Sequence, residues 1–178
     1  MTTNKLCLTA MGTALFVALT MCLQVPVFEN YYLCLGYVVM MIFCYWFSPV
    51  SSVMVGALGV VLYCLLTSGL RGMPGWAAGN IVIALSVSLT CKYTHELKNR
   101  CVRILILLSV IIGSTAAGIL GIKSAVEMML YAQPFLLRVT KNVYAFVADI
   151  VVMTMSIPVC EKMENIISKL FPDEIAVG

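Results

Sequence analysis

The residues of this chain best suited to chemistry lie in its C-terminal third. One face of a predicted helix carries a polar stripe at the spacing i, i+4, i+7 and i+11: Arg138, Asn142, Ala145 and Asp149. A cation, an amide and a carboxylate on one face can hold a polar ligand through charge-assisted hydrogen bonds. Lys141 lies one residue away from this stripe. With Arg138 it favours a ligand that carries a carboxylate or phosphate group.

Asp149 lies between Ala148 and Ile150, in the middle of a long apolar stretch. A carboxylate in the core of a membrane costs a few kcal/mol or more unless it is paired, hydrated or protonated. We therefore expect Asp149 to face the interior of a helix bundle. Two interpretations remain open: a ligand pocket that opens outward, or an internal polar contact that fixes helix packing.

A second pair of candidates precedes this stripe in the sequence. Trp76 and Asn80 are four residues apart, so they share one face of a helix and can line the same cavity. A lone tryptophan at this position is also typical of an anchor at the membrane interface. Arg71 and Glu29 lie in predicted loops, where a charge is more often solvated than bound to a ligand.

Motifs for catalysis, nucleotide binding and metal binding are missing from the sequence. The eight cysteines have no metal-like spacing, and His95 is the sole histidine. Neither the phosphate-binding G-x-x-x-x-G-K-[ST] loop nor the G-x-S-x-G nucleophile motif occurs. We therefore predict that the protein is not an enzyme and uses no cofactor or metal.

The composition places these residues in a membrane protein. Of the 178 residues 62% are hydrophobic and 11% are charged, and the mean hydropathy is +1.03. The stretch from Asn30 to Leu70 carries no charged side chain. It is too long for one crossing of a bilayer and is interrupted at Ser48-Pro49, where a proline suits the first turn of a new helix. The net charge of +3 is scattered, so a nucleic-acid partner is not indicated.

We predict an all-α membrane protein in which residues 1–178 form a single bundle of six transmembrane helices. The predicted crossings are Leu6–Val25, Tyr31–Phe47, Pro49–Leu66, Trp76–Tyr93, Ile104–Ile122 and Leu137–Val159. The segment from Lys123 to Pro134 is predicted to be partly helical at the membrane surface. Gly and Pro between Thr67 and Gly75 indicate a loop.

The basic residues predict the orientation. With six crossings both termini lie on one side, which then holds seven of the 11 Lys and Arg residues: Lys5, Lys92, Lys98, Arg100, Arg103, Lys162 and Lys169. The other side holds Arg71, Lys123, Arg138 and Lys141. Because basic residues are retained in the cytoplasm, both termini are predicted to be cytoplasmic. The longer connections are then external, which favours a ligand that enters from outside.

The first predicted helix carries a stripe of small residues, Ala10, Ala14 and Ala18, at four-residue spacing. Small side chains let a second helix approach closely, which is how helices associate in lipid. The spacing alone fits a partner subunit and a neighbouring helix of the same chain equally well.

Taken together, these features resemble the S components of energy-coupling factor (ECF) transporters, the substrate-binding membrane subunits of prokaryotic vitamin importers. The resemblance covers nearly the whole chain. It rests on the length, the six crossings and the alanine stripe in the first helix. It also rests on Ser48-Pro49 leading to Val55-Gly56-Ala57-Leu58-Gly59, and on Met73-Pro74-Gly75-Trp76 opening the fourth crossing.

The resemblance implies a function and a set of partners. Such a subunit binds a vitamin or related micronutrient near the outer face of the prokaryotic plasma membrane and docks on a transmembrane T subunit with two cytoplasmic ATPases. It implies that Ala10, Ala14 and Ala18 contact the T subunit, and that ATP hydrolysis elsewhere reorients the S component. The substrate-binding residues are expected to be Trp76, Asn80, Arg138, Lys141, Asn142 and Asp149. The alternative is a small membrane scaffold without a ligand, for which a buried acid in line with Arg138 has little use.

Overall fold

Helices account for nearly all the regular structure in the part of the chain that the computed structural model describes, which is residues 3–22, 25–28, 31–67, 72–94, 97 and 99–170. They are α1 (Thr3–Cys22), α2 (Gly36–Trp46), α3 (Pro49–Leu66), α4 (Met73–Thr94), α5 (Arg100–Thr115), the π-helix η1 (Ala116–Lys123), α6 (Ser124–Tyr131), α7 (Phe135–Lys162) and α8 (Glu164–Leu170). Two short antiparallel strands, β1 (Val25–Phe28) and β2 (Tyr31–Leu33), precede α2.

Five helical segments are long and apolar enough to cross a membrane. They are Thr3–Cys22, Pro49–Leu66, Met73–Thr94, Arg100–Tyr131 and Phe135–Lys162. These segments coincide with the first, third, fourth, fifth and sixth crossings predicted from the sequence. The chain is therefore a helical, multi-pass membrane protein.

The predicted second crossing differs from the structure. Within residues 31–47 the first three residues form β2, and only Gly36–Trp46 is helical, with 11 residues. A helix of that length rises about 16 Å, roughly half the thickness of the hydrocarbon core. The cause of the error is burial, because 9 of the 11 residues of α2 are buried within the protein. Their hydrophobicity reflects a core helix rather than exposure to lipid.

The fifth membrane-spanning segment is longer in the structure than was predicted from the sequence. The helix does not end at Ile122 but continues through η1 and α6 to Tyr131, over 32 residues. It ends at Ala132, whose left-handed backbone (φ 50°) closes the helix. The turn between α2 and α3 is as predicted: the Ser48 hydroxyl accepts a hydrogen bond from the Ser51 backbone N–H at 3.3 Å, and Pro49 occupies the first turn of α3.

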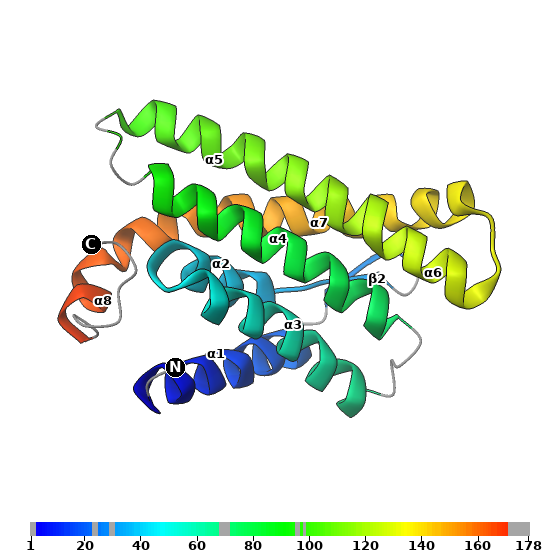
Figure 1. Cartoon of the computed structure of the whole chain (residues 1–178), viewed down its shortest axis with the longest axis horizontal. Coiled ribbons are helices and arrows are strands. Elements are labelled where there is room, and N and C mark those ends of the chain that lie inside the picture. Colours follow the sequence, from blue (N-terminus) through cyan, green and yellow to red (C-terminus); the bar gives the residue numbers. More distant parts are fainter. Residues whose placement is uncertain are drawn as a thin grey trace.

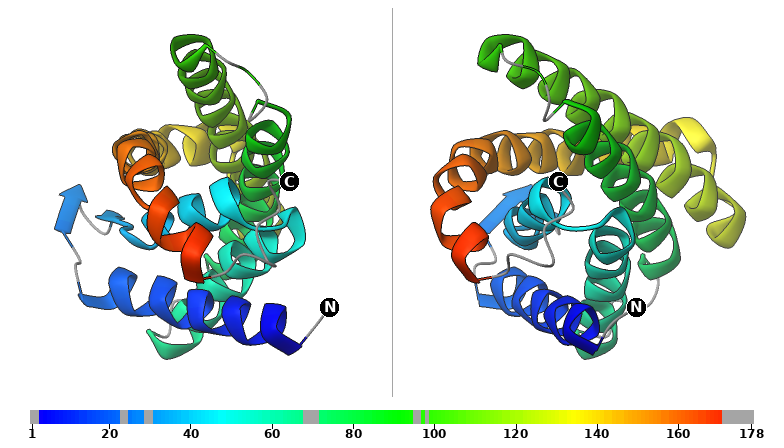
Figure 2. Two further views of the ribbon diagram at one scale, coloured as in Figure 1. Left: turned by 90° about the vertical axis from the view of Figure 1, so that its left-hand side faces the viewer. Right: turned by 60° about the vertical axis from the view of Figure 1, so that its left-hand side comes forward.

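Successive long helices run in alternating directions, with α2 at the centre of the bundle (Figure 1). The start of α1, the α2–α3 turn, the start of α5 and α8 lie at one end. We call this the basic end, because the elements there carry Lys5, Lys92, Arg100, Arg103, Lys162 and Lys169. The opposite end holds the end of α3, the start of α4 and the α6–α7 turn. Figure 2 shows α1, α3, α4 and α7 surrounding α2.

Glycines permit close contact between helices at two helix–helix interfaces. A Cβ atom on Gly79 of α4 would lie 2.8 Å from the Gly118 carbonyl oxygen in η1, and a Cβ atom on Gly118 would lie 2.8 Å from the Gly79 carbonyl oxygen. A Cβ atom on Gly12 of α1 would overlap the ring of Phe43. At the interface of α4 with η1 the backbones of the two helices touch each other, so neither helix can move aside for a side chain.

Candidate functional site

A hydrogen-bonded polar group lies in the interior between α2, α3 and α4. The Trp76 indole N–H donates to the Tyr37 hydroxyl at 3.0 Å, and that hydroxyl donates to the Asn80 side-chain oxygen at 2.7 Å. The Asn80 amide N–H donates to the Gly56 carbonyl oxygen at 3.1 Å. Tyr37 and Asn80 are completely buried, and the Tyr63 ring meets the Trp76 ring edge-on with centroids 5.7 Å apart. The side chains of Trp76 and Asn80 thus both face the interior between α2, α3 and α4.

Asp149 faces the same interior from α7. Its side chain is buried, and it interacts with the Tyr37 hydroxyl and electrostatically with Lys123, the last residue of η1. A buried acid in a membrane helix is expected to have such partners. The expectation that Asp149 points into the bundle is therefore met, and Tyr37 connects it to Asn80.

A second polar group lies between α6 and α7, nearer the opposite end of the bundle. Arg138 Nη1 is 3.6 Å from Glu127 Oε2, and its guanidinium carbon lies 4.6 Å from the centroid of the Tyr131 ring. The Asn142 amide N–H groups donate to Glu127 Oε2 at 3.3 Å and to the Ser124 hydroxyl at 3.0 Å. Arg138 and Asn142 thus share a partner on α6.

These two groups together form a charge-balanced interior. Glu127 and Asp149 supply two acids, and Lys123 and Arg138 supply two bases. Lys123 lies within electrostatic range of the other three. The spacing of Lys123 and Glu127, four residues apart, puts both on one side of the helix. The balance lowers the cost of placing charges in a membrane helix bundle.

The predicted polar residues have different surroundings in the structure. Asn142 and Asp149 are buried, Ala145 is partly buried, and Arg138 has 19% of its side chain exposed. Lys141 is exposed on another face of α7. Four charged or titratable residues named in the predictions from the sequence lie outside the described part of the chain: Glu29, Arg71, His95 and Lys98.

The alanine stripe of α1 faces away from the bundle. Ala10, Ala14 and Ala18 are all exposed, whereas the opposite face of α1 packs inward through six buried residues: Thr9, Gly12, Thr13, Phe16, Val17 and Thr20. The stripe is therefore not used for packing within the described chain. Its small residues present a smooth surface on which another helix can lie.

The family model for the S component of the ECF-type riboflavin transporter matches residues 1–161. The chain belongs to this family. A comparison with curated proteins finds no match. Membership of the ECF riboflavin S components confirms the resemblance found in the sequence and shows a membrane protein of vitamin uptake. The family is one of transport, which supports the expectation that the protein is not an enzyme.

Four members of the polar interior of this S component were not predicted from the sequence: Tyr37, Lys123, Ser124 and Glu127. Tyr37 stands in an uncharged run and gives no local signal. Lys123 and Glu127 do give one, because they place two opposite charges four residues apart directly after an apolar run. Within the described residues no three His, Cys, Asp or Glu side chains are grouped to hold a metal ion.

Proposed function

We propose that the chain is the substrate-binding S component of an ECF-type importer for riboflavin, and that residues 1–178 act as one substrate-binding domain. The observation that carries the proposal is the family match over residues 1–161. The scaffold alternative has no comparable support, since it leaves the polar interior without a use.

The proposed site is the polar interior at the end of the bundle away from the basic end. Riboflavin combines a planar aromatic ring system with a chain of hydroxyl groups. Trp76 offers an aromatic ring face, and the polar interior also holds side chains that can bond hydroxyl groups: Asn80, Arg138, Asn142 and Asp149. Lys141 stands on the exposed face of α7, so we leave it outside the proposed site.

The charge balance of the interior bears on the kind of ligand. The sequence favoured a carboxylate or phosphate group on the ligand, because the cations Arg138 and Lys141 lie near each other. In the structure Arg138 lies beside Glu127, and Lys123 interacts with both Glu127 and Asp149. An interior whose charges already balance does not need an anionic ligand. It suits riboflavin, which is uncharged at neutral pH.

We propose six crossings with both termini in the cytoplasm of a prokaryotic cell. The second of these crossings would be formed by α2 together with the strand β2 before it. Backbone that is not helical is tolerated at membrane depth where protein surrounds it, and α2 lies within the bundle. The basic end would face the cytoplasm.

We propose that α1 docks on the T subunit through Ala10, Ala14 and Ala18, whose exposure leaves that face free for a partner. Two ATPases bound to the T subunit would supply the energy for reorientation. The chain carries no nucleotide-binding loop of its own.

Purification of the full chain from cells grown with riboflavin tests the proposal. Small molecules released by denaturing the protein would be identified by absorbance and mass. We expect riboflavin at close to one equivalent per chain. A different vitamin in its place would contradict the assigned substrate. A chain without any small molecule that also fails to bind added riboflavin would favour the scaffold alternative.

A further inference from the structure

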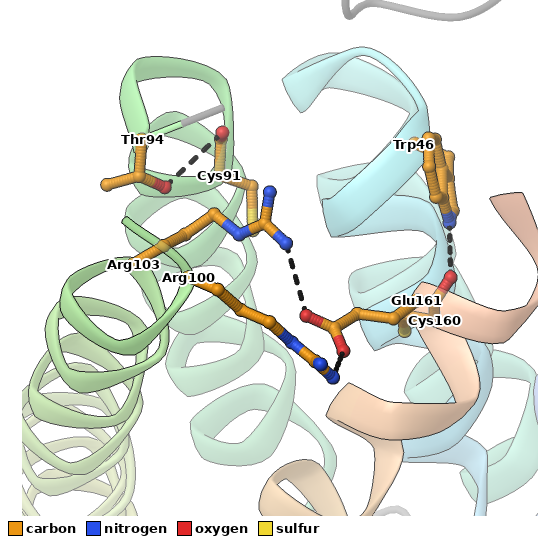
Figure 3. Close-up of polar contacts among 7 residues, drawn as sticks. All are labelled: Trp46, Cys91, Thr94, Arg100, Arg103, Cys160 and Glu161. Carbon is orange, nitrogen blue, oxygen red and sulfur yellow. Dashed lines mark hydrogen bonds and ion pairs between the residues drawn. The ribbon is translucent and has the colours of Figure 1, made fainter. Parts of the chain in front are cut away.

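A charged cavity at the basic end is not part of the proposed vitamin site. It has a volume of about 380 Å³ and lies between the start of α5 and the end of α7. Its lining residues are Arg100, Arg103, Pro158, Glu161 and Lys162. Figure 3 shows Arg100 and Arg103 reaching from α5 toward Glu161 on α7. Figure 2 shows that this part of α5 lies at the periphery of the bundle.

Ion pairs across the cavity hold its charged groups in place. Arg100 Nη2 lies 2.5 Å from Glu161 Oε2, and Arg103 Nη2 lies 3.1 Å from Glu161 Oε1. Directly before Glu161, the Cys160 carbonyl oxygen accepts a hydrogen bond from the buried Trp46 indole at 3.0 Å (Figure 3). The end of α7 is thus tied to α2, so Glu161 offers a fixed anchor for the two arginines.

The cavity keeps a surplus of positive charge. Three cations and one carboxylate line it, which leaves a net charge of +2. Each guanidinium has five N–H donors, and Glu161 accepts one hydrogen bond from each of the two arginines. Arg100 has 72% of its side chain exposed. Donors therefore remain for an anionic group that enters the cavity, and the arginine fork suits phosphate.

Exposed apolar side chains of α7 continue the side of that helix that lines the cavity, because Met155 and Val159 each precede a cavity-lining residue by three positions. On α7, Met155 is 71% exposed and Val159 is 42% exposed. A ligand that combines an anionic head with hydrocarbon chains can contact the charges and these apolar surfaces at once. A free phosphate ion would use the charges alone.

We propose that this cavity binds the phosphate of an anionic phospholipid, whose acyl chains lie along the exposed apolar residues Met155 and Val159 of α7. Basic pockets between transmembrane helices on the cytoplasmic side are suited to anionic headgroups. The site does not depend on the vitamin, so a chain that binds no riboflavin would leave this inference standing.

The test is native mass spectrometry of the full-length protein in detergent, titrated with phosphatidylglycerol or with phosphatidylcholine. We expect the anionic lipid to bind preferentially. The double variant Arg100→Gln/Lys162→Gln keeps the Arg103–Glu161 ion pair and removes two charges from the cavity. At about fivefold for each charge, it should weaken phosphatidylglycerol binding roughly 25-fold. The matched control Lys92→Gln/Lys169→Gln removes two exposed charges from the same end outside the cavity, and should change binding less than twofold.

A second variant separates recognition of the anion from a merely structural role. Glu161→Gln raises the net charge of the cavity, so it should bind phosphatidylglycerol at least as tightly as the unaltered protein. Weaker binding by Glu161→Gln, or an equal loss in the matched control, would overturn the proposal. Displacement of the lipid by millimolar inorganic phosphate would show a site for the free anion, which also contradicts it.

Discussion

Asp149 shows how far single residues can be interpreted from the sequence. Its place in the middle of an apolar segment was enough to predict that it faces the interior, and it does. Its partners could not be predicted, because Tyr37 and Lys123 come from distant segments that only the fold brings together. Arg138 shares a face of α7 with Asn142 as predicted, but nothing in the sequence indicates that Glu127 lies beside it.

We predict that Asp149→Asn weakens riboflavin binding roughly ten- to hundredfold. A hydrogen bond to a charged group contributes about 1.5–3 kcal/mol, and 1.4 kcal/mol corresponds to a tenfold change in affinity. Titration of the purified variant in detergent measures the effect, with folding checked by gel filtration. Thr140→Ala, on an exposed face of the same helix, is the control and should bind as the unaltered protein does. Unchanged affinity in Asp149→Asn would assign Asp149 to helix packing, the second interpretation left open by the sequence.

The helices differ in how well the sequence predicts them. Pro49 and its capping serine place the start of α3 correctly, because that signal is local. The central helix α2 was predicted too long, since hydrophobicity alone does not distinguish burial in protein from exposure to lipid. The π-helix η1 was not predicted, and its close contact with α4 at Gly118 and Gly79 joins segments that are distant in the sequence.

We predict that Gly79→Ala destabilises the fold by about 1–3 kcal/mol, the usual cost of overpacking. The added methyl group would meet the Gly118 carbonyl oxygen, which the rigid backbone of η1 cannot move away. Thermal unfolding in detergent measures the change. Gly113→Ala is the matched control: a Cβ atom there meets nothing within 4 Å, and alanine favours a helix, so its stability should be equal or slightly higher. Equal unfolding temperatures for the two variants would argue against close packing of α4 on η1.

At the surface of α1 we predict that Ala14→Trp prevents assembly with the T subunit and the ATPases while riboflavin binding persists. An exposed indole on the alanine stripe would keep the partner helix at a distance. Pull-down of the tagged S component measures assembly. Leu15→Trp is the control, since residue 15 is also exposed but lies about 100° further around the helix. Recovery of the ATPases with Ala14→Trp at the level of the control would place the docking surface elsewhere.

The two ends of the molecule differ in their content of basic residues, as the sequence predicts. The described basic residues of the predicted cytoplasmic side do lie at one end of the bundle, because the helices alternate in direction (Figure 1).

We predict that a single cysteine at Ala132, in the α6–α7 turn, reacts with a membrane-impermeant reagent in intact cells. The native Cys101 at the basic end should react only after permeabilisation. Each cysteine would be tested alone in a background without the others, and the reverse pattern would show an inverted protein.

Binding of riboflavin by the polar interior of this S component can be measured by titrating the purified full-length protein in detergent with riboflavin and following the fluorescence of the flavin. We predict saturable binding at one riboflavin per chain, with the fluorescence quenched because the flavin ring lies close to Trp76. A chain that is folded by gel filtration, yet leaves flavin fluorescence unchanged and retains no riboflavin in equilibrium dialysis, would contradict the account.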